Sequence, residues 1–216
     1  MSQTKNVLVL CADGSEEMET VIIVDVLRRA QLHVTLAKVA PTPFEKISDS
    51  NFTNALIENA KVVKCSRGVQ IVADTVLAGL DTSIFDAIVL PGGLGGATVF
   101  AASTQVHTVL RDFAAANKLV AAICAAPIAL ASAEVFHGRR VTSYPGFEEK
   151  LGAHYKYSED RVVVDGNLVT SRGPGSCFEF ALAIIAVLCD DDNERRRIVG
   201  SVGDALILPS AVSYSK

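Results

Sequence analysis

Short hydrophobic runs recur along the chain and alternate with longer amphipathic segments. Residues 7–11, 85–90 and 119–123 are apolar at nearly every position, which is typical of parallel strands buried on both faces. Residues 16–30 instead place apolar side chains near helical spacing, with acids in the first turn and Arg28-Arg29 in the last, as the helix dipole favours. This alternation predicts an α/β fold with a mostly parallel sheet.

The same patterns predict the remaining elements. Turn residues at 66–68 and 165–167 predict two hairpins. Residues 41–60 carry prolines, serines and mixed charges, and are predicted to form a surface insertion. The other predicted strands are 33–39, 62–65, 69–73, 141–143 and the two arms of 162–170; the other predicted helices are 103–117, 177–188 and 190–200, with a helical turn within 145–151.

Composition narrows the class of protein. The chain has 216 residues, half of them hydrophobic, which fits one domain spanning 1–216. Its 20 basic and 24 acidic residues give a net charge of −4 without long blocks of one sign, so specific nucleic-acid binding and a basic membrane face are not expected. The five cysteines are far apart and form no Cys-x-x-Cys pair, which predicts reduced thiols and argues against a structural zinc site. We expect no metal and no cofactor.

The first residues do not form a secretory signal. The apolar run at 7–10 is followed almost at once by Asp13 and Glu16, and the apolar stretch around Cys124 is too short for a membrane span and contains Pro127. These features predict a cytoplasmic protein without a membrane segment.

The stretch 119–131 changes abruptly from strand-like to helix-like residues, with Cys124 at the change. One interpretation is a tight strand-to-helix turn that holds a cysteine nucleophile at a helix N-terminus, with the helix beginning at Ala125. The other is a buried strand running into a buried helix, with Cys124 as a small hydrophobic residue. Taken alone, the stretch favours the second, because free cysteine is usually buried.

Two further segments favour the nucleophile. Residues 91–96 place four glycines after a strand, where exposed N–H groups can hold an oxyanion or a phosphate. The loop lacks the ending of a Walker motif, and an oxyanion suits a cysteine better. Glu19 lies just beyond the carboxyl end of the first strand, where ligands bind in open α/β sheets. Glu16 and Glu17 are expected only to complement the helix dipole.

Two charged loop residues have open roles. His154 either orients or deprotonates the thiol, or is a surface histidine, and the sequence favours neither. Arg67 at a hairpin tip is more typical of a solvated charge than of an anion clamp beside the site.

Five motifs, in order along most of the chain, resemble the DJ-one branch of the ThiJ/PfpI superfamily. They are Gly-Ser-Glu-Glu-Met-Glu-Thr at 14–20, Leu-Pro-Gly-Gly at 90–93, Ala-Ala-Ile-Cys-Ala-Ala-Pro at 121–127, His-Tyr-Lys-Tyr-Ser-Glu at 154–159 and Thr-Ser-Arg-Gly-Pro-Gly at 170–175. The resemblance implies a flavodoxin-like three-layer sandwich with a nucleophile elbow, and a homodimer.

The resemblance also implies roles for single residues. Cys124 is then the nucleophile, Glu19 its carboxyl partner and His154 the nearby histidine, while the N–H groups of Gly93 and Ala125 form the oxyanion hole. Gly92 and Arg67 would lie on the substrate side. Ala125 stands where the protease branch has histidine, which disfavours a peptidase.

The activities implied are cofactor-free conversion of methylglyoxal to lactate and repair of early glycation adducts on proteins or nucleotides. We expect donors around Cys124 to lower the thiol pKa, and Glu19 to hold a proton that it donates to the thiolate. The alternative is a redox sensor or chaperone in which oxidation of Cys124 is the signal. A glutamine-amidotransferase-like hydrolase is weaker, because Lys156 stands two residues after His154, where an acid would be needed.

Overall fold

The computed structural model describes residues 4–39 and 60–209. The predicted insertion at 41–60 lies outside the described residues except for its last position.

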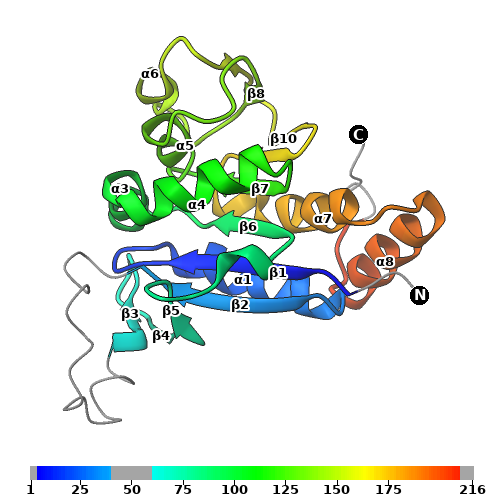
Figure 1. Ribbon diagram of the computed structural model, residues 1–216. Helices are drawn as coiled ribbons and strands as arrows, with labels where there is room; N and C mark the ends of the chain where they lie inside the picture. The colour runs from blue at the N-terminus through cyan, green and yellow to red at the C-terminus, as the bar shows by residue number, and fades with distance from the viewer. Residues whose placement is uncertain (1–3, 40–59, 210–216) are drawn as a thin grey trace.

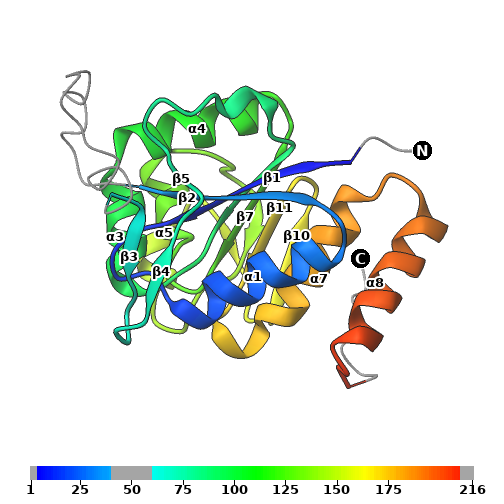
Figure 2. The ribbon, with the colours of Figure 1, turned by 90° about the horizontal axis from the view of Figure 1, so that it is seen from below.

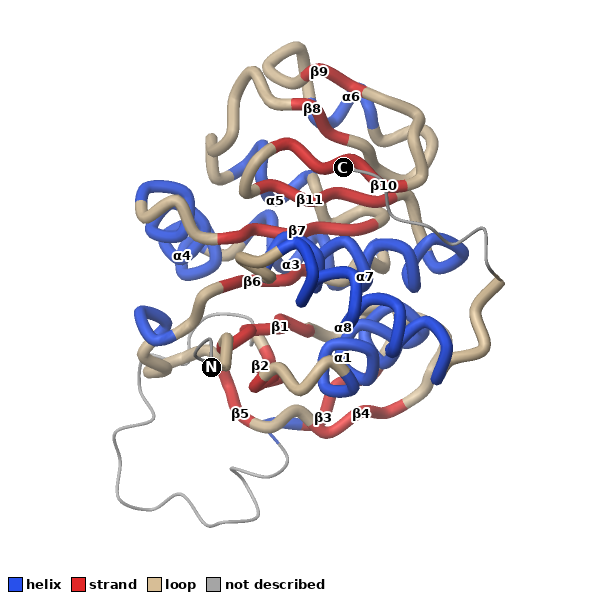
Figure 3. Tube along the Cα trace, turned by 90° about the vertical axis from the view of Figure 1, so that its right-hand side faces the viewer, coloured by secondary structure: helices blue, strands red, loops and turns tan. Residues whose placement is uncertain are grey.

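A seven-stranded sheet forms the centre of the molecule. Its order is β10-β11-β7-β6-β1-β2-β5, and Figure 3 shows the strands stacked in this sequence. Every neighbouring pair is parallel except β10 and β11, which form the predicted antiparallel hairpin. The strands are β1 (Asn6–Cys11), β2 (His33–Lys38), β5 (Thr75–Val76), β6 (Ala87–Leu90), β7 (Leu119–Ile123), β10 (Val162–Asp165) and β11 (Leu168–Ser171).

Helices cover both faces of this sheet, as Figure 2 shows most clearly. Successive strand residues point to opposite faces, so Val7 and Val9 pack under one helical layer and Leu8 and Leu10 under the other. One layer consists of α1 (Glu17–Arg29), α7 (Cys177–Leu188) and α8 (Asp192–Ala205), and the other of α3 (Leu94–Ala102), α4 (Thr104–Ala115) and α5 (Ile128–Ser132). The predicted three-layer α/β sandwich is confirmed.

Two small sheets flank the main one (Figure 1). The predicted hairpin of β3 (Val62–Lys64) and β4 (Gln70–Val72) is antiparallel. A second pair, β8 (Arg140–Val141) and β9 (Lys156–Tyr157), is parallel and carries the short helix α6 (Glu148–Leu151) between its strands. The described residues also include the 3-10 turns η2 (Thr82–Ile84) and η3 (Pro174–Ser176).

The structure corrects two predicted boundaries near Cys124. The glycine segment 91–96 is not all loop, because α3 begins at Leu94 and includes Gly95 and Gly96. The helix predicted from Ala125 begins only at Ile128 and is five residues long. Glycine has a poor intrinsic preference for helix, so the glycines at 95 and 96 led to the prediction of a loop. Here close packing requires it, since a Cβ on Gly96 would lie 2.4 Å from Ser15 Oγ.

Within residues 4–39 and 60–209, no helix is long and apolar enough to cross a membrane. All five cysteines are free in the structure.

Candidate active site

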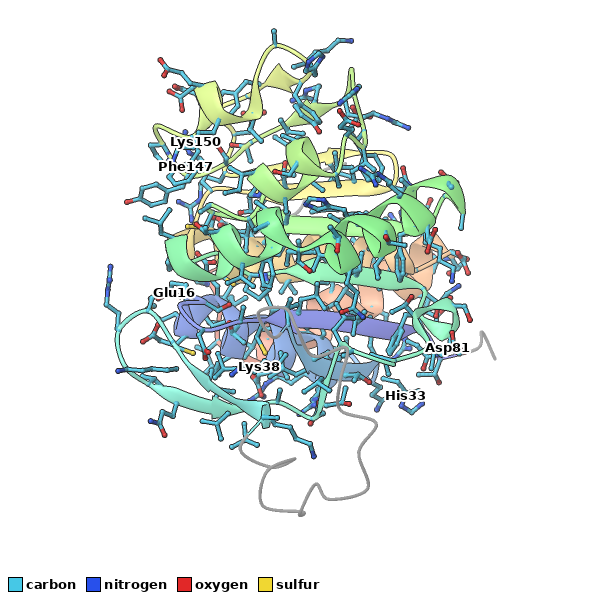
Figure 4. The ribbon with its side chains drawn as sticks, turned by 60° about the vertical axis from the view of Figure 1, so that its left-hand side comes forward. Glu16, His33, Lys38, Asp81, Phe147 and Lys150 are labelled. Atoms are coloured by element: carbon cyan, nitrogen blue, oxygen red, sulfur yellow. The ribbon has the colours of Figure 1, made fainter. Side chains whose placement is uncertain are left out.

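The candidate site lies at one edge of the sheet. Because β1, β6, β7 and β11 run parallel, their carboxyl ends meet at this edge. Cys124 directly follows β7, Gly92 follows β6, and Glu19 lies in the first turn of the helix after β1. In Figure 4 this edge is marked by Glu16 and Phe147, whereas His33 and Asp81 mark the opposite edge.

Cys124 forms the predicted elbow. Its φ is +64°, a left-handed conformation that costs an ordinary residue about 1–2 kcal/mol. Two backbone hydrogen bonds hold it there: its N–H donates to the carbonyl of Ser171 at 2.9 Å, and its carbonyl accepts from Tyr144 N–H at 2.8 Å. Strain held in place by the surrounding structure is typical of functional sites.

Gly92 lies between Cys124 and Glu19, where there is no space for a side chain. Its N–H donates to Glu19 Oε2 at 2.7 Å. A Cβ added to Gly92 would lie 2.5 Å from Cys124 Cβ and 2.9 Å from Glu19 Oε2. Glycine at this position therefore allows the thiol and the carboxyl group to face each other.

Glu19 is fully buried beside the thiol. Burial raises its pKa to about 7. Hydrogen bonds with the Gly92 N–H and with the Cys124 thiol lower the pKa and offset only part of this rise. Its second oxygen, Oε1, has no hydrogen-bond partner of ordinary geometry in the described part of the chain. A carboxyl group with a pKa near neutrality and a free oxygen can both accept and donate a proton at this site.

The thiol pKa moves in the opposite direction from the one predicted. Burial, followed by the negative charge of Glu19, raises the pKa of Cys124 to about 12, while the N–H groups of Gly93 and Ala125 lower it. The prediction of a lowered thiol pKa is therefore wrong. The sequence indicated the N–H donors, but not that only 8% of Cys124 would be exposed next to a buried carboxylate.

The two predicted oxyanion donors do lie at the sulfur. The N–H groups of both Gly93 and Ala125 interact with it. Gly93 caps α3 with φ +81°, and a Cβ on it would lie 2.4 Å from the carbonyl oxygen of Gly14. The loop after β1 thus packs directly behind one of the donors and fixes its direction.

His154 does not reach the candidate site. His154 precedes β9, whereas Tyr144 follows β8 and donates its N–H to the Cys124 carbonyl. Because β8 and β9 are parallel, His154 and Tyr144 lie at opposite ends of this strand pair. The exposed ring of His154 stacks on His137 with centroids 4.8 Å apart. Its predicted role beside the thiol is therefore wrong, because the topology of a two-residue strand pair was invisible in the sequence.

Glu17 has a larger role than predicted. It is 7% exposed, and its carboxylate accepts from Ser66 Oγ at 2.9 Å and from Arg67 N–H at 2.8 Å. Ser66 N–H also donates to Ser15 at 2.8 Å. The turn between β3 and β4 is thereby fixed to the start of α1, with the Arg67 side chain exposed.

Tyr144 is the residue that sequence reasoning missed. It is bonded through its backbone to Cys124 and is 47% exposed. The signal was present in Tyr-Pro-Gly-Phe at 144–147, since Pro followed by Gly is typical of a tight turn. Within the same described ranges, no group of three or more His, Cys, Asp or Glu side chains is arranged to hold a metal ion.

Comparison with known proteins identifies the family. The DJ-1/PfpI family model matches residues 5–187. The chain belongs to this family. Protein dj-1beta of Drosophila melanogaster is 45% identical over 182 residues, which cover 84% of this chain and 88% of the relative. The crystal structure of Drosophila DJ-1beta has a TM-score of 0.82 and 42% identity, and the match covers 96% of this chain and 100% of that one.

Two further DJ-1/PfpI relatives carry functional descriptions. The glutathione-independent glyoxalase DJR-1.2 of Caenorhabditis elegans is 31% identical over 189 residues, covering 87% of this chain and 91% of that protein. A structure of oxidized Toxoplasma gondii DJ-1 is 33% identical with a TM-score of 0.80, and the match covers 95% of this chain and 99% of that one.

Proposed function

We propose that the chain is a cofactor-independent glyoxalase that converts methylglyoxal to lactate, with early glycation adducts as further substrates and protection against oxidative stress as the outcome. One observation carries the proposal: the Cys124 sulfur lies between two N–H donors and the buried carboxyl group of Glu19. The C. elegans glyoxalase at 31% identity supports it.

The raised thiol pKa fits a mechanism in which Glu19 acts as the base. As Sγ adds to the aldehyde carbon, the thiol proton passes to Glu19 and the aldehyde oxygen becomes an oxyanion. The N–H groups of Gly93 and Ala125 bind that oxyanion, which then takes the proton from Glu19 to give a hemithioacetal. No free thiolate has to form first.

Glu19 then moves a proton between the two substrate carbons. Its carboxylate removes the proton from the carbon bonded to sulfur, giving an enediolate. The hydroxyl proton of that carbon passes to the oxygen of the neighbouring carbon, and Glu19 returns its proton to that neighbouring carbon. The product is a thioester of lactate, which water cleaves to lactate and the free thiol. Methylglyoxal and one water thus give lactic acid, with no net oxidation and no cofactor.

The test is production of lactate from methylglyoxal by wild type, Cys124→Ala and Glu19→Ala. Methylglyoxal also reacts with arginine and lysine side chains, so lactate is measured and not only loss of substrate. We expect lactate from the wild type and from the control cysteine variant Cys189→Ser, and none from Cys124→Ala or Glu19→Ala. Lactate production by Cys124→Ala protein would exclude the mechanism.

A second candidate is a redox sensor or chaperone in which Cys124 is oxidised to the sulfinate and Glu19 hydrogen-bonds the product. The oxidized T. gondii relative favours it, as does the Cys124 sulfur beside N–H donors and the Glu19 carboxyl group. Intact-mass spectra after graded peroxide test it, with Glu19→Ala for comparison. Oxygen addition spread evenly over the five cysteines would rule against a dedicated sensor.

We further propose a cytoplasmic homodimer that forms through α1 and the β3–β4 hairpin. A groove of about 250 Å³ runs between these elements, lined in part by Val21, Val24, Ile71 and Val72. Val21 and Val72 are 52% and 61% exposed, and apolar patches of this kind mark association surfaces. We propose that Arg67, at the tip of the hairpin fixed to the start of α1, meets the substrate at the edge of this dimer. Val72→Glu should shift the mass measured by light scattering to that of the monomer.

A further inference from the structure

Exposed apolar side chains gather around the residues of the candidate site. Leu94, 61% exposed, directly follows Gly93, and Tyr144 is hydrogen-bonded through its backbone to Cys124. Single exposed apolar residues are common on any protein, but apolar walls with a few polar groups are typical of small-molecule sites. Tyr144 is the aromatic side chain of this set.

A tight turn fixes the Tyr144 ring. Phe147 N–H donates to the Tyr144 carbonyl at 3.1 Å, and Gly146 between them has φ +85°, a left-handed conformation suited to glycine. The turn brings the two rings edge to face, with centroids 6.3 Å apart and planes at 87°. Lys150 lies over the Phe147 ring with Nζ 4.5 Å from its centroid, and Figure 4 shows these two side chains next to each other. The Tyr144 ring therefore has a fixed neighbour on one side.

On its other side the ring reaches the loop after β11. A Cβ added to Gly173 would lie 3.4 Å from Tyr144 Cδ2. Gly173 is close in sequence to Ser171, whose carbonyl accepts the Cys124 N–H. The ring thus lies between Phe147 and the loop after β11, and its own backbone holds the Cys124 carbonyl. We call the face of this ring the wall.

We propose that Tyr144 is a specificity-determining residue that makes the Cys124 site favour α-oxoaldehydes with an aromatic substituent, the aryl glyoxals, over methylglyoxal. This proposal rests on the proposed function, since it names the substituent that the substrate of the same site carries. An aryl ring gains an offset or edge-to-face contact with Tyr144 in addition to its buried area. A methyl group is too small to make that contact.

Turnover gives the first test. The kcat/KM for phenylglyoxal, measured as mandelate formed, is compared with that for methylglyoxal in wild type, Tyr144→Phe and Tyr144→Ala. We expect Tyr144→Ala to lose about tenfold on phenylglyoxal and less than about twofold on methylglyoxal, because only the aryl contact is removed. Tyr144→Phe should retain the wild-type preference. Equal losses on both substrates, or no loss on phenylglyoxal, would overturn the proposal.

Alkylation of Cys124 tests the same wall without turnover. Phenacyl bromide and bromoacetone carry the two substituents, and with either reagent Sγ displaces bromide. Each rate, followed by intact mass, is divided by the rate of the same reagent with a small free thiol. We expect Tyr144→Ala to lose the normalised preference for phenacyl bromide, and Ile84→Ala to keep it, since Ile84 is 58% exposed in η2 at the opposite sheet edge.

The two tests separate the proposals. If the wild type forms neither hydroxy acid but the alkylation preference depends on Tyr144, the proposed function fails and the wall stands. If both hydroxy acids form and the preference is the same in Tyr144→Ala as in wild type, the wall fails and the proposed function stands.

Discussion

Cys124 and Cys177 are two buried thiols that contact the same residue, Glu19, in different ways. Cys124 faces the Glu19 carboxyl group, whereas the Cys177 thiol donates to the Glu19 backbone carbonyl at 3.6 Å. Cys177 begins a helix of twelve residues, but it is fully buried and its φ is an ordinary −68°. Burial raises its pKa well above the usual value. A position at the start of a long helix is therefore not enough to make a cysteine a reactive site.

What distinguishes Cys124 is geometry. It precedes a helix of only five residues, yet its left-handed turn presents the sulfur to two N–H groups and to a carboxyl group that can take its proton. Variants of Cys124, Cys177 and Glu19 test this distinction.

The largest effect should be on activity. Cys124→Ser should lower lactate production on the order of 10³-fold or more, because the alcohol is a much weaker nucleophile at this position. Cys177→Ser should stay within about threefold of wild type, since a serine hydroxyl can still donate to the Glu19 carbonyl. Parallel assays of the two purified variants check this. Similar losses in both would mean that the two thiols are not functionally distinct.

The second effect is on stability. The folded protein holds the Glu19 proton up to pH about 7, while the unfolded chain releases it near 4.5. Stability from this group is therefore present below pH 4.5 and is lost as the pH rises to about 7. Urea unfolding measures the free energy of unfolding of Glu19→Gln and of wild type at each pH. The value of the variant minus that of wild type should increase by about 3 kcal/mol between pH 4.5 and 8. A difference that does not change with pH would contradict the raised pKa.

The third effect is on the pH dependence of alkylation. Iodoacetamide should modify Cys124 about ten times faster at pH 8 than at pH 6, because Glu19 must be ionised to accept the thiol proton and its pKa is about 7. In Glu19→Gln the levelling-off above pH 7 should disappear, because the rate then follows the free thiolate alone and rises about tenfold per pH unit through pH 8. Peptide mass spectra separate modification of Cys124 from that of Cys177. The same rise in both proteins would show that Glu19 does not take the proton.

The smallest effect comes from the different backbone conformations of residues 124 and 177. At position 124, glycine should be more stable than alanine by about 1 kcal/mol, since φ +64° strains any residue with a Cβ. At position 177 the order should reverse by about 0.5–1 kcal/mol, because the residue is helical. Four thermal denaturation curves measure both differences. The same order of stability at both positions would show that the backbone of residue 124 is not strained.

The sequence predicted most of the main sheet, because buried parallel strands and amphipathic helices have distinct periods. Cys124, Glu19 and Gly93 were also predictable, since each follows a strand that ends at the same sheet edge. His154 was misplaced and Tyr144 missed because both depend on the direction of one two-residue strand pair. The thiol pKa was mispredicted because it depends on burial, which local residue types do not report.

The hydrogen bond from Cys124 to Ser171 also has a consequence for folding. The elbow needs Gly92 from an earlier strand end, Tyr144 from a flanking pair and Ser171 from the last strand of the chain. Such long-range contacts close late, because loop entropy must be overcome before they form. During synthesis the thiol therefore keeps the reactivity of an ordinary cysteine until β11 joins the sheet. Pairing of β11 with β7 is then the event that matures the nucleophile.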